Sequence, residues 1–328
     1  MMLPYSLLDL APINQGGSVA QALNNSRRMA VVAEQCAYQR VWLAEHHGMQ
    51  GVASSATALV IGHIASATKN IRVGSGGIML PNHSPLVIAE QFGTLEALYP
   101  GRIDIGLGRA PGSDMATARA LRRDLNSPVD DYPQSIRELQ GFLGPSKGEA
   151  AIHAVPGQNS NIPLWLLGSS LYSAQLAASM GLPYSFASHF APDQLYDALS
   201  IYRHHFKPSK QSQSPYVSAG LMAVVAQSDE QAQYLFTSVQ QQFIKMRRGV
   251  NQAFSAPVDS IVGLCSEAER LMINHTLQYA LVGSQATVKA KLAQFLAATQ
   301  VDEIIVSMPI FDIEARLKSV ELFAECMT

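Results

Sequence analysis

Short apolar runs alternate with stretches of helical apolar spacing along the chain. The runs in the first part of the chain have the length of strands and cover residues 3–10, 40–46, 71–80 and 102–108. Between them, apolar residues recur at helical spacing, which predicts helices over residues 18–37, 54–68 and 84–98. This part of the chain therefore predicts repeated strand–helix units.

The same alternation continues in the second part of the chain, with more irregular connections. Strands are predicted at residues 163–167, 183–188, 216–226 and 302–309. Helices are predicted at residues 131–143, 170–180, 192–206 and 228–246, and a last helix extends to about residue 326.

Eight strands that alternate with helices predict parallel pairing through right-handed crossovers. In a chain of 328 residues they favour a closed (β/α)8 TIM barrel, built as one domain over residues 1–328. Residues 247–300 exceed one strand–helix unit, so we expect an insertion before the last strand. An open doubly wound sheet is the alternative, but no Gly-x-Gly-x-x-Gly turn follows the first strand.

The composition excludes several classes of partner. The chain is 48% hydrophobic and has a formal net charge of -2, so no basic surface for nucleic acid is expected. Its three cysteines have neither disulfide nor metal-ligand spacing, which suits a reducing cytosol. Neither a signal peptide nor an apolar stretch of about 18 residues is present, so we expect a cytoplasmic protein that does not enter the membrane.

Polar and glycine residues follow six of the predicted strands. In a (β/α)8 barrel the active site lies at the C-terminal ends of the strands, where the following loops meet. The residues found there are Asp9, Glu45-His46-His47, Gly76-Gly77, Gly108-Arg109, Gly168-Ser169-Ser170 and Ser188-His189.

The histidine pair at residues 46 and 47 raises the question of a metal site. Neighbouring strand residues point to opposite faces, so His46 and His47 cannot both line the barrel mouth. The remaining histidines show no ligand spacing, and we expect no metal. A histidine that orients a carboxylate or a cofactor is the functional interpretation, and a structural histidine is the alternative.

Two further segments suggest a flat, phosphorylated ligand. Gly76 and Gly77 lack side chains at a strand end, which permits close approach of a flat group, although a strand bulge is the alternative. After Gly168, the sequence S-S-L-Y-S places hydroxyls and backbone N–H groups at a helix N-terminus, which suits a phosphate. Arg109 can add its charge to that anion, and a loop salt bridge with Asp114 is its alternative role.

These segments resemble the bacterial luciferase-like flavin monooxygenases. The resemblance rests on W-L-A-E-H-H at 42–47, V-G-S-G-G-I-M-L-P at 73–81, Q-F-G-T-L-E-A-L-Y-P-G-R-I-D-I-G-L-G-R-A-P-G-S-D at 91–114, P-L-W-L-L-G-S-S at 163–170 and L-V-G-S at 281–284. It is dense over the first 170 residues and looser afterwards. The resemblance implies a (β/α)8 barrel that binds flavin mononucleotide (FMN), in the reduced form that a separate flavin reductase supplies.

The resemblance also implies roles for single residues. His46 matches the catalytic base, Arg109 matches an arginine at the flavin, and Gly76-Gly77 match a non-proline cis peptide beside the flavin ring. Gly168, Ser169, Ser170 and Ser173 match the strand-five phosphate site. A second phosphate-binding arginine should be one of Arg119, Arg122 and Arg123.

Two positions depart from the luciferases themselves. Ser169 stands where they have a glutamate, and Gly108 stands where they have a reactive cysteine. Both differences argue against luciferase-type oxidation of aldehydes.

The predicted function is thus a monooxygenase that uses reduced FMN and dioxygen, through a C4a-peroxyflavin, on a small organic substrate. The first alternative is a deazaflavin-dependent hydride-transfer enzyme on the same barrel, because both cofactors carry a phosphate. The second alternative is a non-catalytic flavin-binding protein. The resemblance further implies a homodimer, which small residues at 53–67 can support by close packing.

Overall fold

The computed structural model describes residues 3–109, 115–121, 131–145 and 152–328. Within them, eight parallel strands form a closed ring, in which each strand pairs with its neighbours and β9 returns to β1. The ring strands are β1 (Tyr5–Asp9), β2 (Arg40–Leu43), β3 (Arg72–Met79), β4 (Ile103–Gly108), β5 (Leu164–Gly168), β6 (Tyr184–Phe186), β7 (Val217–Val225) and β9 (Glu303–Ser307). The predicted (β/α)8 TIM barrel is confirmed.

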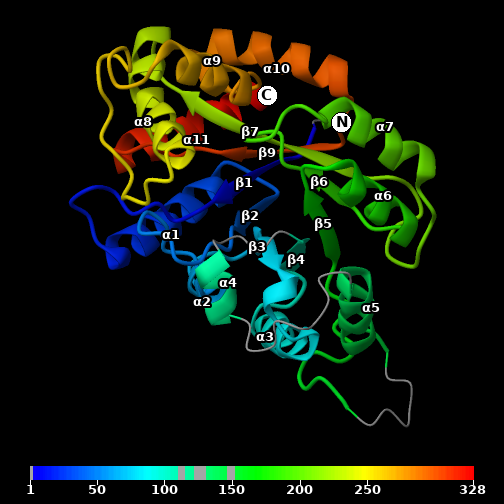
Figure 1. The fold of residues 1–328 in the computed structure, drawn as a ribbon. Helices are drawn as coiled ribbons and strands as arrows, with labels where there is room; N and C mark the ends of the chain where they lie inside the picture. Colours follow the sequence, from blue (N-terminus) through cyan, green and yellow to red (C-terminus); the bar gives the residue numbers. More distant parts are fainter. Residues whose placement is uncertain (1–2, 110–114, 122–130, 146–151) are drawn as a thin grey trace.

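Helices surround the ring of strands (Figure 1). Those that match the sequence prediction are α1 (Val19–Gln35), α2 (Thr57–Ala65), α3 (Pro85–Leu98), α5 (Tyr132–Leu143), α6 (Leu171–Met180), α7 (Leu195–His205), α8 (Asp229–Arg247) and α11 (Ile313–Met327). Alternate strand residues point outward onto these helices, as Val217, Ala219 and Leu221 of β7 do in the main apolar core.

The segment before the last strand contains elements that the sequence pattern does not predict. They are α9 (Glu267–Thr276), β8 (Leu281–Gly283) and α10 (Gln285–Thr299). Strand β8 lies outside the closed ring and pairs in parallel with Ala223–Val225 at the end of β7. The short helices η1 (Leu80–Asn82) and α4 (Met115–Leu121) are also new. A strand of three residues is too short to produce a recognisable period of two.

Large apolar side chains fill the inside of the barrel. Leu8, Trp42, Trp165 and Ile305 form a separate buried cluster there. The two indole rings meet edge to face, with 5.2 Å between their centroids. The barrel is therefore a packed core below its mouth, and a ligand site has to lie above these rings.

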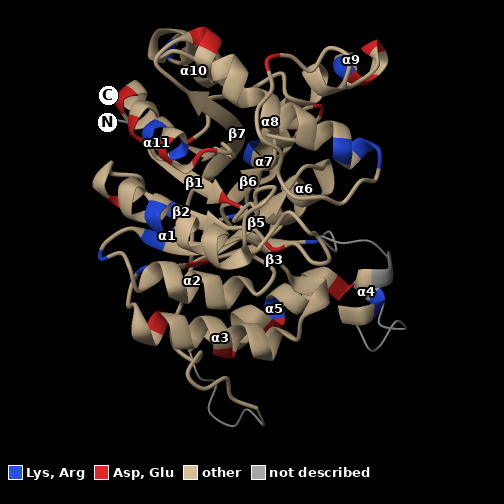
Figure 2. Cartoon of the chain, turned by 90° about the vertical axis from the view of Figure 1, so that its left-hand side faces the viewer, with Lys and Arg blue, Asp and Glu red and all other residues tan. Residues whose placement is uncertain are grey.

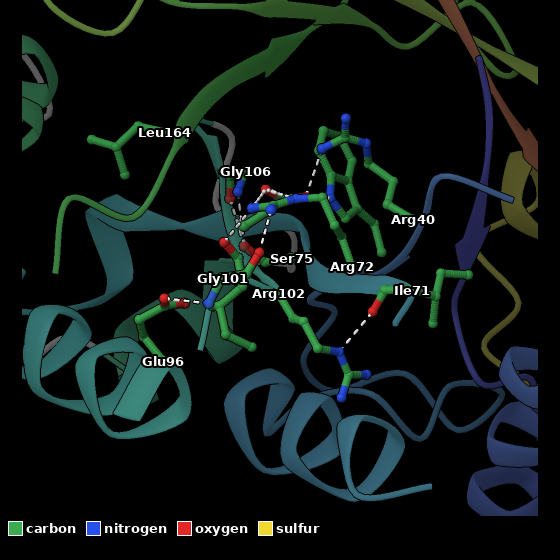
Figure 3. A network of polar contacts seen from close by, with 12 residues as sticks. Arg40, Ile71, Arg72, Ser75, Glu96, Gly101, Arg102, Gly106 and Leu164 are labelled. Carbon is green, nitrogen blue, oxygen red and sulfur yellow. Dashed lines mark hydrogen bonds and ion pairs between the residues drawn. The ribbon is translucent and has the colours of Figure 1, made fainter. Parts of the chain in front are cut away.

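A buried ionic network closes the opposite end of the barrel, where the strands begin. Arg40 donates from Nη1 to Asp104 Oδ2 at 2.6 Å and from Nε to Glu303 Oε1 at 2.9 Å. Arg72 reaches the other Asp104 oxygen at 2.6 Å, and the Tyr216 hydroxyl donates to Glu303 at 3.0 Å. Figure 3 shows Arg40 and Arg72 in this region. Polar groups at this end of a β/α barrel serve stability rather than catalysis.

On the side of the molecule that Figure 2 shows, charged residues of both signs are present. In Figure 2 the Lys and Arg residues lie in small groups on several helices, interspersed with Asp and Glu. No helix among the described residues is long and apolar enough to cross a membrane.

Candidate active site

Glu45 is the centre of a buried cluster at the end of β2. Its side chain is fully buried, and its Oε1 atom lies 2.7 Å from Nε2 of His47 and 2.8 Å from Nε2 of His83. The other oxygen accepts a hydrogen bond of 3.0 Å from the backbone N–H of Met79. Glu45 thus joins the loop after β2 to the end of β3 and to the segment after η1.

The hydrogen bonds keep Glu45 ionised. Burial by itself would raise the pKa of this carboxyl group, but the hydrogen bonds from His83, His47 and Met79 outweigh it, so the pKa is lowered. An ionised carboxylate only accepts hydrogen bonds, so each imidazole donates from Nε2.

Glu45, His47 and His83 are also close enough to hold a metal ion, since their possible ligand atoms lie within 4.8 Å of one another. The same short distances fit two hydrogen bonds from the imidazoles to Oε1, and the expectation that no metal binds here stays a prediction. The sequence spacing does not reveal this grouping, because His83 comes from a different strand–helix unit.

His46 lies on the other side of the same segment. Ala44, two residues earlier, belongs to the cluster inside the barrel, whereas Glu45 and His47 point together toward His83. His46 interacts electrostatically with His189, which follows β6. The two histidines therefore lie on different sides of the segment, although β2 itself ends at Leu43, and His46 is the one that lies near His189.

His189 is the second imidazole at the mouth. Burial, together with the neighbouring His46, lowers its pKa to about 4. Its Nδ1 atom is buried and has no hydrogen-bond partner in the described part of the chain. At neutral pH the ring is therefore uncharged.

Gly76 and Gly77 lie at the mouth end of β3 and are joined by a cis peptide bond, as the family resemblance implies. A Cβ atom at Gly76 would lie 2.6 Å from Leu8 Cδ1, and one at Gly77 would lie 2.6 Å from the Gly106 oxygen. Protein atoms thus occupy the space beside both Cα atoms. The register of β3 against β4 also shifts between Gly76 and Ile78, so the strand irregularity considered as an alternative is present. The role of these glycines at a flavin ring stays a prediction.

The predicted phosphate site lies at the N-terminus of α6. Ser170 caps this helix and accepts a hydrogen bond from the Ser173 backbone N–H. The Ser173 hydroxyl packs against Gly168, where a Cβ atom would lie 2.5 Å from it, and it contacts the Tyr184 hydroxyl at 2.9 Å. Ser169 occupies the turn between strand and helix and is half-buried. The four residues therefore lie together, as the sequence predicts.

Arg109 is held beside this helix terminus by an aromatic ring. Its guanidinium lies over the Tyr172 ring, 4.5 Å from the centroid. Tyr172 is in the first turn of α6, between Ser170 and Ser173. The cation–π contact thus places a positive charge at the positive end of a helix dipole, which favours an anion.

Tyr132, the first residue of α5, lies next to the same group. It interacts electrostatically with Tyr172 and Arg109, and burial raises the pKa of its hydroxyl, which stays protonated. That hydroxyl is buried and has no hydrogen-bond partner in the described residues. A buried donor without a partner is costly, so an acceptor is expected here.

Sequence reasoning missed the roles of Tyr132, Tyr172 and His83. Tyr172 lies inside the segment S-S-L-Y-S quoted for the phosphate site, and this position was the signal that the sequence offered. Of the competing arginines, Arg119 is exposed on α4, and Arg122 and Arg123 lie outside the described residues, as does Asp114.

The insertion covers part of the barrel mouth. Phe254 exchanges backbone hydrogen bonds with Ile13 and Gln15 in the loop after β1. The Asn251 side chain accepts from the Gln50 N–H at 2.8 Å and donates to the Gly48 oxygen at 2.6 Å, in the loop after β2. These contacts place the insertion over two of the loops that form the mouth.

Comparison with known proteins gives consistent matches over the whole barrel. The family model described as luciferase-like monooxygenase matches residues 4–303. A "luciferase-like monooxygenase" of Escherichia coli is 50% identical over 318 residues, which cover 97% of this chain and 95% of the relative. The crystal structure of apo-MsnO8 is similar with a TM-score of 0.88 at 32% identity, and the match covers 99% of this chain and 98% of that one.

Two more distant structures share the fold and differ in cofactor. The oxygenating constituent of 3,6-diketocamphane monooxygenase from Pseudomonas putida, in complex with FMN, has a TM-score of 0.76 at 18% identity, covering 99% of this chain and 97% of that one. An F420-dependent secondary alcohol dehydrogenase has a TM-score of 0.70 at 14% identity, covering 99% and 98%. At these identities the likeness concerns the fold alone.

Proposed function

The chain belongs to the luciferase-like monooxygenase family, and from this premise we propose that it is an oxidoreductase that uses reduced FMN and dioxygen to oxygenate a small organic substrate.

The observation that carries the proposal is the group of donors at the N-terminus of α6. Arg109 lies over Tyr172, Ser170 caps the helix, and the buried Tyr132 hydroxyl lacks a partner in the described residues. A phosphate monoester offers acceptor oxygens and negative charge to all three, so the residues present fit the phosphate end of FMN. Ser169, Ser173 and the backbone at Gly168 complete the set of residues that would hold it.

The protein's own contribution is binding, orientation and proton handling. Bound FMN would supply the electrons that activate dioxygen. His46 lies at the mouth, where its imidazole can accept a proton from a reacting group and return it. Arg109 contributes a fixed positive charge close to the cofactor, and the insertion over the mouth helps to exclude water.

A deazaflavin-dependent hydride transfer is the second candidate. The fold likeness to an F420-dependent alcohol dehydrogenase supports it, and a phosphate site of this kind serves either cofactor. FMN is favoured because the 50% identical relative is described as a monooxygenase. A separate flavin reductase is part of the proposal, because the reduced cofactor has to be delivered.

The test is an anaerobic titration of the purified protein with chemically reduced FMN, followed by addition of air. We expect saturable binding, with riboflavin binding more weakly because it lacks the phosphate, and then oxygen uptake. The absence of binding by reduced FMN would overturn the proposal. Binding of reduced F420 with hydride transfer and no oxygen uptake would favour the second candidate.

A further inference from the structure

His189 stands across the barrel mouth from His46. It follows β6, and β2 and β6 are separated by three strands on either side of the ring, so they face one another. Ser188 is buried, and its hydroxyl donates to the Gly220 oxygen of β7 at 2.6 Å. This bond fixes the turn that carries His189 against the neighbouring strand.

The imidazole ring of His189 points into the barrel. Ala219 and Leu221 of β7 pack outward in the core under the helices, so Gly220 between them faces inward. A Cβ atom at Gly220 would clash with Nδ1 of His189 and lie 3.1 Å from its Cε1. The ring therefore occupies the place where an inward side chain of β7 would be.

One edge of the ring is sealed and the other is accessible. Nδ1 is buried against Gly220 and has no hydrogen-bond partner among the described residues, whereas the residue as a whole keeps intermediate exposure. Nε2 does not belong to these buried atoms without a partner, so the accessible nitrogen of the ring is Nε2, on the opposite edge. A neutral imidazole has one N–H, and placing it on the accessible Nε2 avoids a buried donor without a partner.

We propose that His189 is a second active-site imidazole, which donates a hydrogen bond from Nε2 to an oxygen atom of the substrate, opposite His46. The lowered pKa of His189 agrees with a neutral donor at physiological pH. The Phe190 ring, 4.8 Å away and nearly perpendicular, adds an apolar wall beside it.

The proposal defines a substrate class and rests on the proposed function for the site itself. A molecule held between two imidazoles has to present an oxygen acceptor, such as a ketone, amide or ester carbonyl, close to its reacting centre. A plain hydrocarbon chain would leave the Nε2 donor without a partner, which costs binding energy. The expected substrate is therefore a carbonyl-bearing molecule rather than an unsubstituted alkane.

The test uses the FMN-free protein with labelled histidine nitrogen and cyclohexanone as the probe. Long-range proton–nitrogen NMR spectra report which ring nitrogen of His189 carries the hydrogen. We expect the hydrogen on Nε2, and a shift of this resonance as cyclohexanone is added. Methylenecyclohexane, which has the same shape without the oxygen, should leave the Nε2 resonance of His189 in place.

Variants separate hydrogen bonding from packing. H189F should weaken cyclohexanone binding about two- to tenfold, the range of one neutral hydrogen bond, and leave binding of methylenecyclohexane unchanged. H189Q, which restores an N–H donor, should recover part of the difference. H205F, at an exposed position of α7, is the matched control, and thermal melting verifies that each variant is folded.

Three results would overturn the proposal. The first is a hydrogen on Nδ1 of His189, and the second is that added cyclohexanone leaves the His189 signals unchanged. The third is that H189F binds cyclohexanone and methylenecyclohexane with the same affinities as the wild type does. Failure of the proposed function is separate, because it would appear as absent binding of reduced FMN by the wild type, whatever the NMR spectra show.

Discussion

Arg109 lies against an aromatic ring, and among the described residues no carboxylate forms an ion pair with it. Its guanidinium lies 4.5 Å above the Tyr172 ring. Stacking uses the flat face of the guanidinium, so its N–H groups, which lie in the plane, stay directed outward. A salt bridge would use the same N–H groups and neutralise the charge. The stacked arrangement therefore suits a residue that binds an anion.

At this scale we predict the effect of removing the Arg109 charge. R109A should weaken FMN binding by about ten- to a hundredfold, the value of a hydrogen bond to a charged group. R109K should recover little of it, because lysine lacks the planar fork that stacks and binds two oxygens. Fluorescence titration of oxidised FMN measures both.

Riboflavin is the control ligand for these two variants. Since it has no phosphate, its affinity should be nearly the same for the wild type, R109A and R109K. An equal loss for riboflavin and FMN would show that Arg109 acts elsewhere than at the phosphate.

At the scale of elements, Glu45 connects two neighbouring strand–helix units. It accepts hydrogen bonds from His47 in its own loop and from Met79 and His83 in the next unit. His46 lies between Glu45 and His47, so this cluster also fixes the backbone that presents His46 to the mouth. The carboxylate thus acts on the site through position rather than by contact with substrate.

We predict that E45Q destabilises the protein by about 1.5–3 kcal/mol at pH 7, because the bonds that it weakens involve a buried charge. The pKa of Glu45 is lowered on folding, so its contribution is complete above the unfolded value of about 4.3 and is lost as the pH falls through the folded value. The difference between wild type and E45Q should therefore narrow below about pH 4. Urea unfolding at a series of pH values measures it.

Glu314 offers the matched control for E45Q. It pairs with Arg28 at 2.7 Å on the surface, with side chains 70% and 40% exposed. E314Q should change stability by less than about 1 kcal/mol. An E45Q effect as small as this one would contradict the role assigned to the cluster.

At the scale of the whole molecule, the two ends of the barrel carry different tasks. The ionic network of Arg40, Asp104 and Glu303 closes the end where strands begin, and the histidines and the anion site lie at the end where strands finish. Trp42 and Trp165 separate the two ends. Stability and ligand binding should therefore respond to different substitutions.

We predict that R40A lowers the free energy of unfolding by about 3–5 kcal/mol, because it leaves buried carboxylates with fewer partners. The protein that remains folded should bind FMN with unchanged affinity, since Arg40 lies at the other end of the barrel. Chemical unfolding and FMN titration on the same sample test both statements. A large loss of FMN affinity in folded R40A would show that the ends are coupled.

The homodimer is an expectation that belongs to this scale as well. Leu59 on α2 and Leu98 on α3 are 77% and 64% exposed, so each of these two helices presents a large apolar side chain to solvent. Light scattering of the purified protein tests this expectation.

The sequence by itself determined the barrel fold and which residues lie at the C-terminal ends of its strands. Apolar runs such as 71–80 and 102–108 carry a local period that specifies strands, and strand order in a (β/α)8 barrel then brings residues such as His46, Arg109 and Ser170 to one end. Strand alternation also predicts that His46 and His47 point to opposite sides. These predictions depend only on the order of residues along the chain, so they can be made from the sequence alone.

Only the tertiary structure decided which side chains meet at the site. Glu45 binds His83, Arg109 lies on Tyr172, and His189 fills the space beside Gly220, each pair contributed by different strands or helices. Strand β8 likewise forms because it pairs with the end of β7, and the sequence pattern alone does not predict it. Hydrogen bonds, ring stacking and close packing act over a few ångströms in space, and residues that are distant in sequence reach that range only after the barrel has closed.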